Sequence, residues 1–271
     1  MVKNIILAGL TASLLAGCAS TKGPSKMEIE SISEAAVAIT PSKRINELTR
    51  LPPVDGELIP VAVYKFSDLT GQRKPGDNFA ELSTAVTQGS EVFIIKALQD
   101  AGKGTWFKVV ERVNIDNLIK ERQLIRSQRE TYEGAQAKPL QPLIVTGLII
   151  EGGIVGYDSN IVSGGLGARL LGIGVDKQYR KDEVTVILRL VSVNTGEVLL
   201  STGVTKTVFS TAASGNMLKF IDLGTTAVEF EAGTNINEPT TYAVRIAVEQ
   251  AVTEMIKEGA RKELWKFKKK K

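Results

Sequence analysis

Apolar residues recur along the chain in short runs and at helical spacing, which predicts alternating strands and helices. The run PVAVYKF, 60–66, is typical of a buried strand and stops at the turn-rich SDLTGQRKPGDN. Residues 84–102 predict a core-facing helix that ends at Gly102. Its inward positions are expected to be Val92, Ile95, Ala97 and Leu98. A strand is predicted at 106–112, and a helix at 114–130.

The second half of the chain adds strands and one long helix. Residues 142–159 predict a long apolar strand, and residues 182–204 predict a hairpin that turns at 194–196. The segment 239–265 predicts a helix, and Pro239 near its start is compatible with a first helical turn. The mixture of strands and helices predicts an α/β or α+β domain.

Two stretches, 161–181 and 211–235, do not fit this soluble pattern. Each has the roughly 20 to 25 residues that a membrane-spanning hairpin needs, since one spanning strand takes about 9 to 11. Side chains alternate along a strand, so one face can meet lipid and the other water. The predicted lipid-facing set is Leu171, Ile173, Val175, Leu218, Phe220, Val228 and Phe230; the predicted lumen-facing set is Lys219, Glu229 and Glu231. Alternation alone fits surface hairpins of a soluble protein equally well.

Entry of these hairpins into a membrane would require a homo-oligomer. Four strands cannot close a barrel, and an open edge in hydrocarbon leaves backbone N–H and C=O groups without partners. Closure by neighbouring copies implies a ring in which every copy gives two hairpins to a shared sheet. A water-filled pore follows once enough copies join.

The N-terminus has the layout of a secretory signal. Lys3 precedes an apolar run, and Leu15-Ala16-Gly17-Cys18 matches the bacterial lipobox, after which Cys18 becomes the lipidated first residue. A buried cysteine behind an ordinary signal peptide is the alternative. Ala19 after the cysteine is similar to lipoproteins sorted to the outer membrane.

Composition excludes several kinds of chemistry. The chain has no histidine and a single cysteine, so Cys/His zinc sites, Ser-His-Asp triads and internal disulfides are excluded. We therefore expect no enzyme and no cofactor other than the covalent lipid. The net charge of +4 resides largely in the tail KFKKKK, 266–271, and does not imply nucleic acid. Trp106 and Trp265 are expected in the core or at an interface.

The glycine-rich stretch 163–176 lacks the features of a phosphate-binding loop. Gly165 and Gly167 begin a G-x-G-x-x-G pattern, but its third position is Leu170, and no Gly-Lys-Ser/Thr follows. The glycines instead fit the small-residue face of a strongly curved sheet.

Nearly all of the chain that follows the leader resembles the curli secretion channel lipoproteins, the curli production assembly/transport components. The similarity lies in LTRLPP, ALQDAGKGTWFKVVER, IKERQLIR, EGGIVGYDSNIVSGGLGARLLGIGVD, RLVSVNTGEVL, KFID and NEP. The resemblance implies an α/β (α+β) periplasmic domain with two inserted β-hairpins that join an oligomeric transmembrane β-barrel. It also implies a lipid-anchored ring of about nine copies in the outer membrane. Such a ring exports unfolded amyloid subunits without nucleotide, while a periplasmic accessory factor caps the vestibule.

In that family the channel narrows at a loop between the first strand and the first helix. The loop here is 67–83, and its candidate lining residues are either the pair Asn78 and Phe79 or the pair Glu81 and Leu82. Repetition of one aromatic around a ring would make an apolar collar that admits only extended chains. Alternatively, Phe79 packs the loop onto its own domain.

These inferences divide the chain into successive segments. They are a signal peptide (1–17), a lipidated tether (18–55), the first part of the periplasmic domain (56–160), a first hairpin (161–181), periplasmic strands (182–210), a second hairpin (211–235) and a C-terminal helix with a basic tail (236–271). Two rival functions remain: a non-pore periplasmic binding module with docking hairpins, and a hydrolase that uses paired carboxylates.

Overall fold

The computed structural model describes residues 45–72, 85–164, 178–213, 217–223, 228–233 and 239–269, with backbone only for 45–46 and 211–239. All of them belong to one unit of the chain, Pro41–Lys271. None of the helices in these ranges is both long and apolar enough to cross a membrane.

One twisted sheet runs through this unit in the order β2-β1-β3-β4-β5-β6-β7. The strands are β1 (Ile59–Asp68), β2 (Phe107–Glu111), β3 (Leu148–Ser163), β4 (Gln178–Ser192), β5 (Val198–Ala213), β6 (Met217–Leu223) and β7 (Val228–Gly233). The pairs β1–β2 and β1–β3 are parallel, and every later pair is antiparallel. The expected mixed α/β fold is therefore confirmed.

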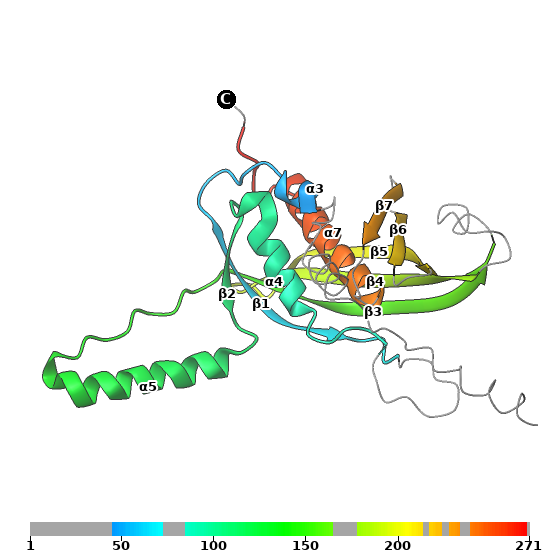
Figure 1. The fold of residues 1–271 in the computed structure, drawn as a ribbon. Coiled ribbons are helices and arrows are strands. Elements are labelled where there is room, and N and C mark those ends of the chain that lie inside the picture. Colours follow the sequence, from blue (N-terminus) through cyan, green and yellow to red (C-terminus); the bar gives the residue numbers. More distant parts are fainter. Residues whose placement is uncertain are drawn as a thin grey trace, which may run out of the picture. The chain divides into compact units, whose positions relative to one another are not determined.

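The described residues form four helices. They are α3 (Ile45–Thr49), α4 (Glu91–Asp100), α5 (Ile115–Glu133) and α7 (Pro239–Arg261), with short 3-10 turns at Ala101–Lys103 and Gly134–Gln136. Figure 1 shows α4 above β1 and β2, and α7 crossing β4 and β5 on the same side. The core lies between these two helices and the sheet, and it combines aliphatic residues with a smaller number of aromatic ones.

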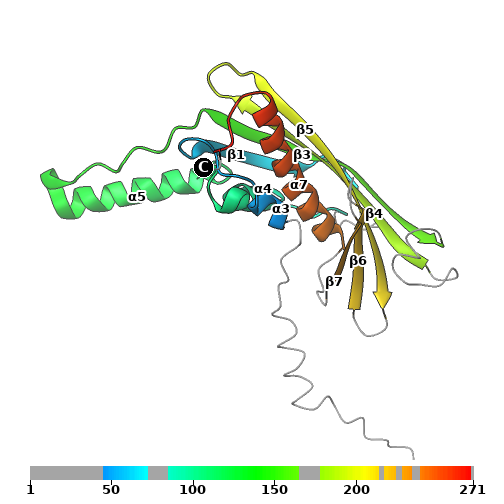
Figure 2. The same cartoon turned by 90° about the horizontal axis from the view of Figure 1, so that it is seen from above.

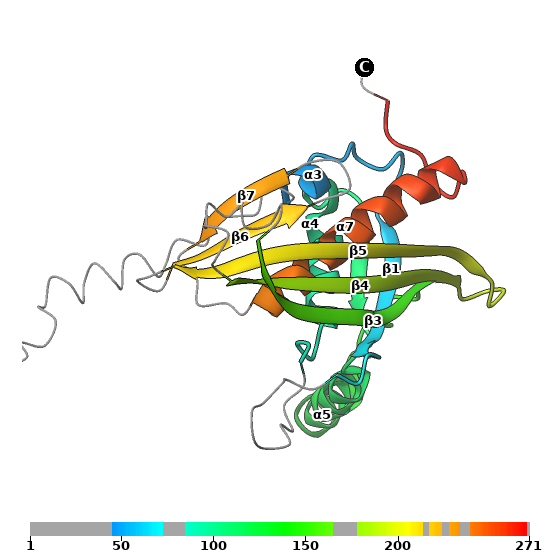
Figure 3. The ribbon, with the colours of Figure 1, turned by 90° about the vertical axis from the view of Figure 1, so that its right-hand side faces the viewer.

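The long helix follows the predicted periodicity, whereas β3 begins at Leu148 and not at residue 142 as predicted. The inward positions of α7 include Ala243, Ile246, Ala247, Val252 and Ile256, and all are fully buried. Every second residue of β4 from Val184 to Leu190 is buried against α7. Figure 3 shows β3, β4 and β5 extending side by side in front of α7. The hairpin turn between β4 and β5 lies at the predicted place, where Gly196 has a positive φ of 71°.

The helix predicted over 84–102 is shorter than expected and is rotated. Residues 85–90 precede it without helical structure, and α4 begins at Glu91. Ile94, Ala97 and Leu98 are its buried residues, whereas Val92 is 63% exposed. Including the non-helical residues 85–90 in the window shifted the expected inward face toward Val92.

The prediction that residues 18–55 pack only locally as a tether is wrong for their last part. Leu48, Leu51 and Val54 are all buried in the main core. Val54 also forms an antiparallel bridge with Phe267 of the basic tail. Short apolar pieces separated by polar residues have no periodicity, so only their long-range partners reveal that they are core.

An aromatic cluster joins the two ends of the described chain. Trp106 is fully buried, and its ring lies 5.9 Å from Trp265 and 5.3 Å from Phe267, edge to face in both cases. The Trp106 indole donates to the Pro52 carbonyl at 2.8 Å, and the Trp265 indole donates to the Ile256 carbonyl at 2.8 Å. The expectation that both tryptophans are core or interface residues is confirmed.

Candidate functional site: the far ends of the long strands

The pairing of β3 and β4 extends well beyond the part of the sheet that α7 covers. The two strands pair continuously from Leu148↔Ser192 to Ser163↔Gln178, with one β-bulge after Ile154. The expected first hairpin, 161–181, contributes its two flanks to this ladder, as in the pair Ile161↔Arg180. Figure 2 shows these strand ends running out past the start of α7.

In this far part of the sheet two strand edges have no partner among the described residues; in the near part, β2 and residues 198–206 of β5 are also paired on one side only. The last position of β3 that pairs with β1 is Ile154, opposite Asp68, so residues 155–163 are paired on one side only. At the other end of the sheet, β7 pairs with β6 alone. Unpaired N–H and C=O groups along an edge are a template for pairing with another chain.

A buried polar cluster marks the point where the strands leave the core. Asp182 on β4 is completely buried, and its Oδ1 accepts from the Tyr157 hydroxyl at 2.9 Å and from Arg180 Nε at 3.0 Å. The Tyr157 hydroxyl also lies 3.1 Å from the Thr240 hydroxyl in the first turn of α7. Asp182 Oδ2 has no hydrogen-bond partner among the residues that the structure describes. The cluster therefore joins β3, β4 and α7 at this boundary.

The Arg180 side chain completes the cluster from its solvent side. It is 43% exposed and donates Nη2 to the Tyr157 hydroxyl at 2.9 Å and Nε to the Ser159 hydroxyl at 2.9 Å. An arginine guanidinium stays protonated in proteins. Arg180 is therefore a permanent cation that compensates the buried carboxylate.

The base of the predicted constriction loop is held by its own hydrogen bonds. Asp68 at the end of β1 accepts from the Thr70 N–H at 2.9 Å, the Thr70 hydroxyl at 2.7 Å and Gln88 Nε2 at 3.3 Å. The Ala85 N–H donates to the Gln72 carbonyl at 3.0 Å. The segment 73–84 therefore starts and ends at two neighbouring points of the fold. The candidate lining residues Asn78, Phe79, Glu81 and Leu82 lie outside the described residues.

The other predicted site residues are only partly placed. Cys18 and the predicted lipid-facing residues Leu171, Ile173 and Val175 lie outside the described residues. The expected second hairpin, 211–235, contains the end of β5, all of β6 and all of β7.

The register of β6 and β7 corrects the division of this second stretch into two faces. It pairs Phe220 with Glu231 and Ile221 with Phe230. Directly paired positions lie on the same face of an antiparallel ladder. Positions 218 and 220 therefore share a face with 229 and 231, whereas position 219 shares a face with 228 and 230. The prediction grouped Leu218 and Phe220 with Val228 and Phe230 because each strand was phased separately, whereas the register between the two strands sets their relative phase.

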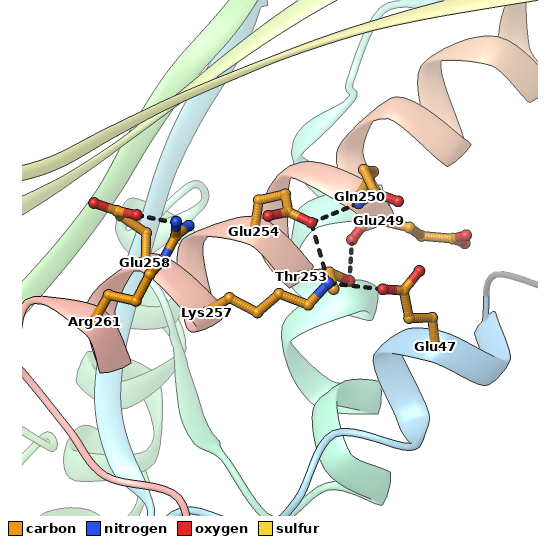
Figure 4. Close-up of polar contacts among 8 residues, drawn as sticks. All are labelled: Glu47, Glu249, Gln250, Thr253, Glu254, Lys257, Glu258 and Arg261. Carbon is orange, nitrogen blue, oxygen red and sulfur yellow. Dashed lines mark hydrogen bonds and ion pairs between the residues drawn. The ribbon is translucent and has the colours of Figure 1, made fainter. Parts of the chain in front are cut away.

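Ion pairs on α7 fix the first described helix to the last one. Lys257 Nζ donates to Glu47 Oε1 of α3 at 2.7 Å and to Glu254 Oε1 at 3.2 Å, and Gln250 Nε2 donates to the same Glu254 oxygen at 2.8 Å (Figure 4). Burial lowers the pKa of Lys257, but its two carboxylate partners outweigh burial and raise the pKa above the ordinary value. Arg261 and Glu258 form a separate pair at 2.7 Å.

Sequence reasoning missed the Tyr157–Asp182–Arg180 cluster. A signal for it does exist in the chain. Asp182 occupies the same phase of the β4 alternation as Val184, Val186 and Leu188, so a carboxylate stands where an apolar residue is expected. A charge in the inward phase of an apolar strand indicates a buried polar partner, although the sequence does not identify that partner.

The fold and these edges define an α/β protein whose sheet extends beyond the part that its helices cover. A sequence model of the family described as "Curli production assembly/transport component CsgG" matches residues 43–271. A relative of that name from Salmonella typhimurium is 40% identical over 223 residues, covering 81% of this chain and 78% of the relative. The relative of the same name from Escherichia coli K12 gives the same identity and coverage. The chain belongs to this family, as the sequence resemblance implied.

Solved structures give more distant matches. A PelC dodecamer from Paraburkholderia phytofirmans is 11% identical, with a TM-score of 0.30, covering 74% of this chain and 92% of that one. A protein from Xanthomonas campestris is also 11% identical, with a TM-score of 0.33, covering 78% of this chain and 87% of that one.

Proposed function

We propose that this protein is a lipid-anchored secretion channel of the outer membrane that exports unfolded curli-type subunits. Several copies close into a ring, and the far ends of the long strands form the membrane-spanning wall. The relatives named curli production assembly/transport components support the choice of cargo. Cys18 carries the lipid, and neither a nucleotide nor a catalytic group takes part in transport.

The observation that carries this proposal is the pair of free edges at opposite sides of the extended strands. Residues 155–163 of β3 and the whole of β7 each need a backbone partner that the described chain does not supply. In hydrocarbon an unpaired edge costs several kcal/mol for each unsatisfied group. Pairing β7 of one copy with β3 of the next removes both edges at once, and repetition of this contact closes a ring.

The short base of the loop 73–84 supports its role as a constriction. A segment that starts and ends at neighbouring hydrogen-bonded points, as at Gln72 and Ala85, is presented from a fixed position in every copy. A ring multiplies the side chains on that segment into a collar, and an apolar collar passes an extended chain but not a folded one. Either Asn78 with Phe79 or Glu81 with Leu82 forms this collar.

Planar-bilayer recording on the purified full-length lipoprotein tests the channel. We expect stable, large, ohmic conductance steps that require neither nucleotide nor metal. Phe79→Ala and Leu82→Ala, measured separately, identify the collar, because the residue that lines it should raise the conductance when truncated. Val92→Ala, on an exposed position of α4 outside both the loop and the proposed wall, serves as the matched control. Silence at high protein concentration would exclude the channel and leave a periplasmic binding module.

A cell-based secretion assay tests the cargo. A reporter subunit kept unfolded should reach the medium, whereas the same subunit fused to a stably folded domain should remain in the periplasm. Conductance without export of any curli-type subunit would retain the pore and contradict the proposed cargo.

A further inference from the structure

Helix α5 is held mainly by the segment that follows it, where Arg122 and Arg129 donate to the carbonyls of Gln141 at 2.7 Å and Lys138 at 2.9 Å. None of its nineteen residues is buried. It forms, with the returning segment 134–147, an arm (residues 113–147) that stands away from the sheet in Figures 1 and 2. Exposed apolar side chains lie along this arm: Ile119 at 41%, Leu124 at 53%, Tyr132 at 81% and Val145 at 85%. Most helical stability in proteins comes from packing an apolar face, so an arm of this composition requires a surface to cover.

The sheet, in turn, has a face that no described helix covers. Ile150, Leu188 and Leu200 point to the face covered by α7, so the residues between them point to the opposite, outer face. The register brings together on that outer face Ile149 with Val191, Glu151 with Arg189, and Ile187 with Gly203. Its apolar members are only partly buried, and Gly203 is exposed. Parallel strands such as β1, β2 and β3 normally have both faces covered.

The handedness of the strand crossovers indicates which helix belongs on that outer face. The crossover from β1 to β2 passes through α4, and the crossover from β2 to β3 passes through α5 in the opposite direction, since the order is β2-β1-β3. Crossovers between parallel strands are right-handed in about 98% of cases, so the two helices belong on opposite faces of the sheet. A right-handed crossover would therefore place α5 on the face of the sheet opposite α4.

The connection between β2 and α5 directs the chain's own arm away from that position. Only residues 112–114 separate the two elements. Glu111 Oε1 accepts from the Asn114 N–H at 2.8 Å, and Arg112 donates to the carbonyls of Glu111 at 2.8 Å and Ile144 at 2.9 Å. These bonds join the start and the end of the arm where it leaves the sheet. A short hinge that holds an element away from its packing surface favours domain swapping, in which that element packs on the same surface of another copy.

We propose that the arm of one copy packs on the outer sheet face of a second copy and occupies the position that connectivity assigns to α5. This contact deepens the proposed function, on which it rests, because it names the periplasmic contact between neighbouring copies of the ring. The contact is head-to-tail, as a ring requires.

Gly203 provides a substitution that separates docking from folding. Its φ is not in the left-handed region, and a Cβ built there meets only Ile187 Cγ1, at 3.9 Å. Larger side chains at position 203 therefore fit the isolated chain but project from the outer face. Gly203→Phe should reduce the assembled fraction at least tenfold at fixed concentration, with an unchanged or higher urea midpoint. Gly203→Ala is the matched control and should assemble normally.

Photo-crosslinking locates the contact directly. Benzoylphenylalanine replaces Leu124 or Tyr132 in the full-length chain. This chain is mixed with ¹⁵N-labelled unmodified chain before assembly in detergent. Native mass spectrometry then measures the copy number. We expect crosslinks between light and heavy chains that map to 149–151, 187–191 or 201–203. A probe at Lys262, just past α7, should give none there.

The outcomes separate the two proposals. Assembled rings whose arm probes crosslink only within one chain, elsewhere or not at all would overturn the arm exchange and leave the pore intact. Normal assembly of Gly203→Phe would overturn it as well. A chain that stays monomeric throughout would contradict both the exchange and the channel.

Discussion

The two ends of the β3–β4 pair have the same backbone pairing but different surroundings. At one end Ile150, Leu188 and Leu190 are buried under α7. At the other end Ile161 is 73% exposed and no described helix covers the strands. The covered end is completed by its own chain, whereas the far end has paired strands but no third partner. Backbone pairing and core formation are thus separable in this protein, and the chain places the break between them at Asp182.

Truncation of one apolar side chain at each end gives the largest contrast. Leu188→Ala should lower the free energy of unfolding by about 3 to 5 kcal/mol, because Leu188 is 1% exposed and its loss leaves a cavity. Ile161→Ala should change it by less than about 0.5 kcal/mol. Urea unfolding followed by circular dichroism measures both. Equal costs would mean that the far end is already covered within the chain.

The boundary between the two ends should be sensitive to its buried carboxylate. Asp182→Ala removes the acceptor for Tyr157 and Arg180 and should cost about 2 kcal/mol, a value kept low because Arg180 can rehydrate. Glu183→Ala removes a partly exposed carboxylate on the next residue and should cost under about 1 kcal/mol. If Asp182→Ala costs no more than Glu183→Ala, the cluster does not stabilise the junction of β3, β4 and α7.

The loop base sharpens the comparison on the side of β1. Asp68→Ala removes three accepted hydrogen bonds at the end of this strand, worth about 1 kcal/mol together at this partly exposed place. Local opening should therefore become about fivefold more frequent, with faster trypsin cleavage after Arg73. Asp100→Ala, which removes an exposed ion pair on α4, is the control and should leave that cleavage rate unchanged.

The smallest effect is expected at the ion pairs between α3 and α7. The pKa of Lys257 is raised in the folded state, so its contribution is fully present below about pH 10.4, the ordinary lysine value, and is lost as pH rises through the folded value. Glu47→Gln should cost less than about 1 kcal/mol at pH 7, because both side chains are partly exposed. Unfolding titrations of both proteins check this, since their difference should vanish above the folded pKa. A difference that grows above pH 10 would contradict the assignment.

Periodicity predicted the elements that pack against the core. β1, β2, the turn at 194–196 and the inward face of α7 follow from patterns within each segment. Leu48 and Val54 were missed because their partners, such as Phe267, are distant in the sequence. The faces of β6 and β7 were misjudged for a related reason, since register between strands is a property of the pair.

The sequence by itself determined which segments become strands and helices and, through its motifs, the family. Tertiary structure decided where those elements stop being covered. Burial depends on which distant residues meet, so no local pattern could show that α5 has no buried residue or that β3 loses β1 after Ile154. Local hydrophobic spacing specifies an element, but only packing specifies whether the chain alone can complete its surroundings.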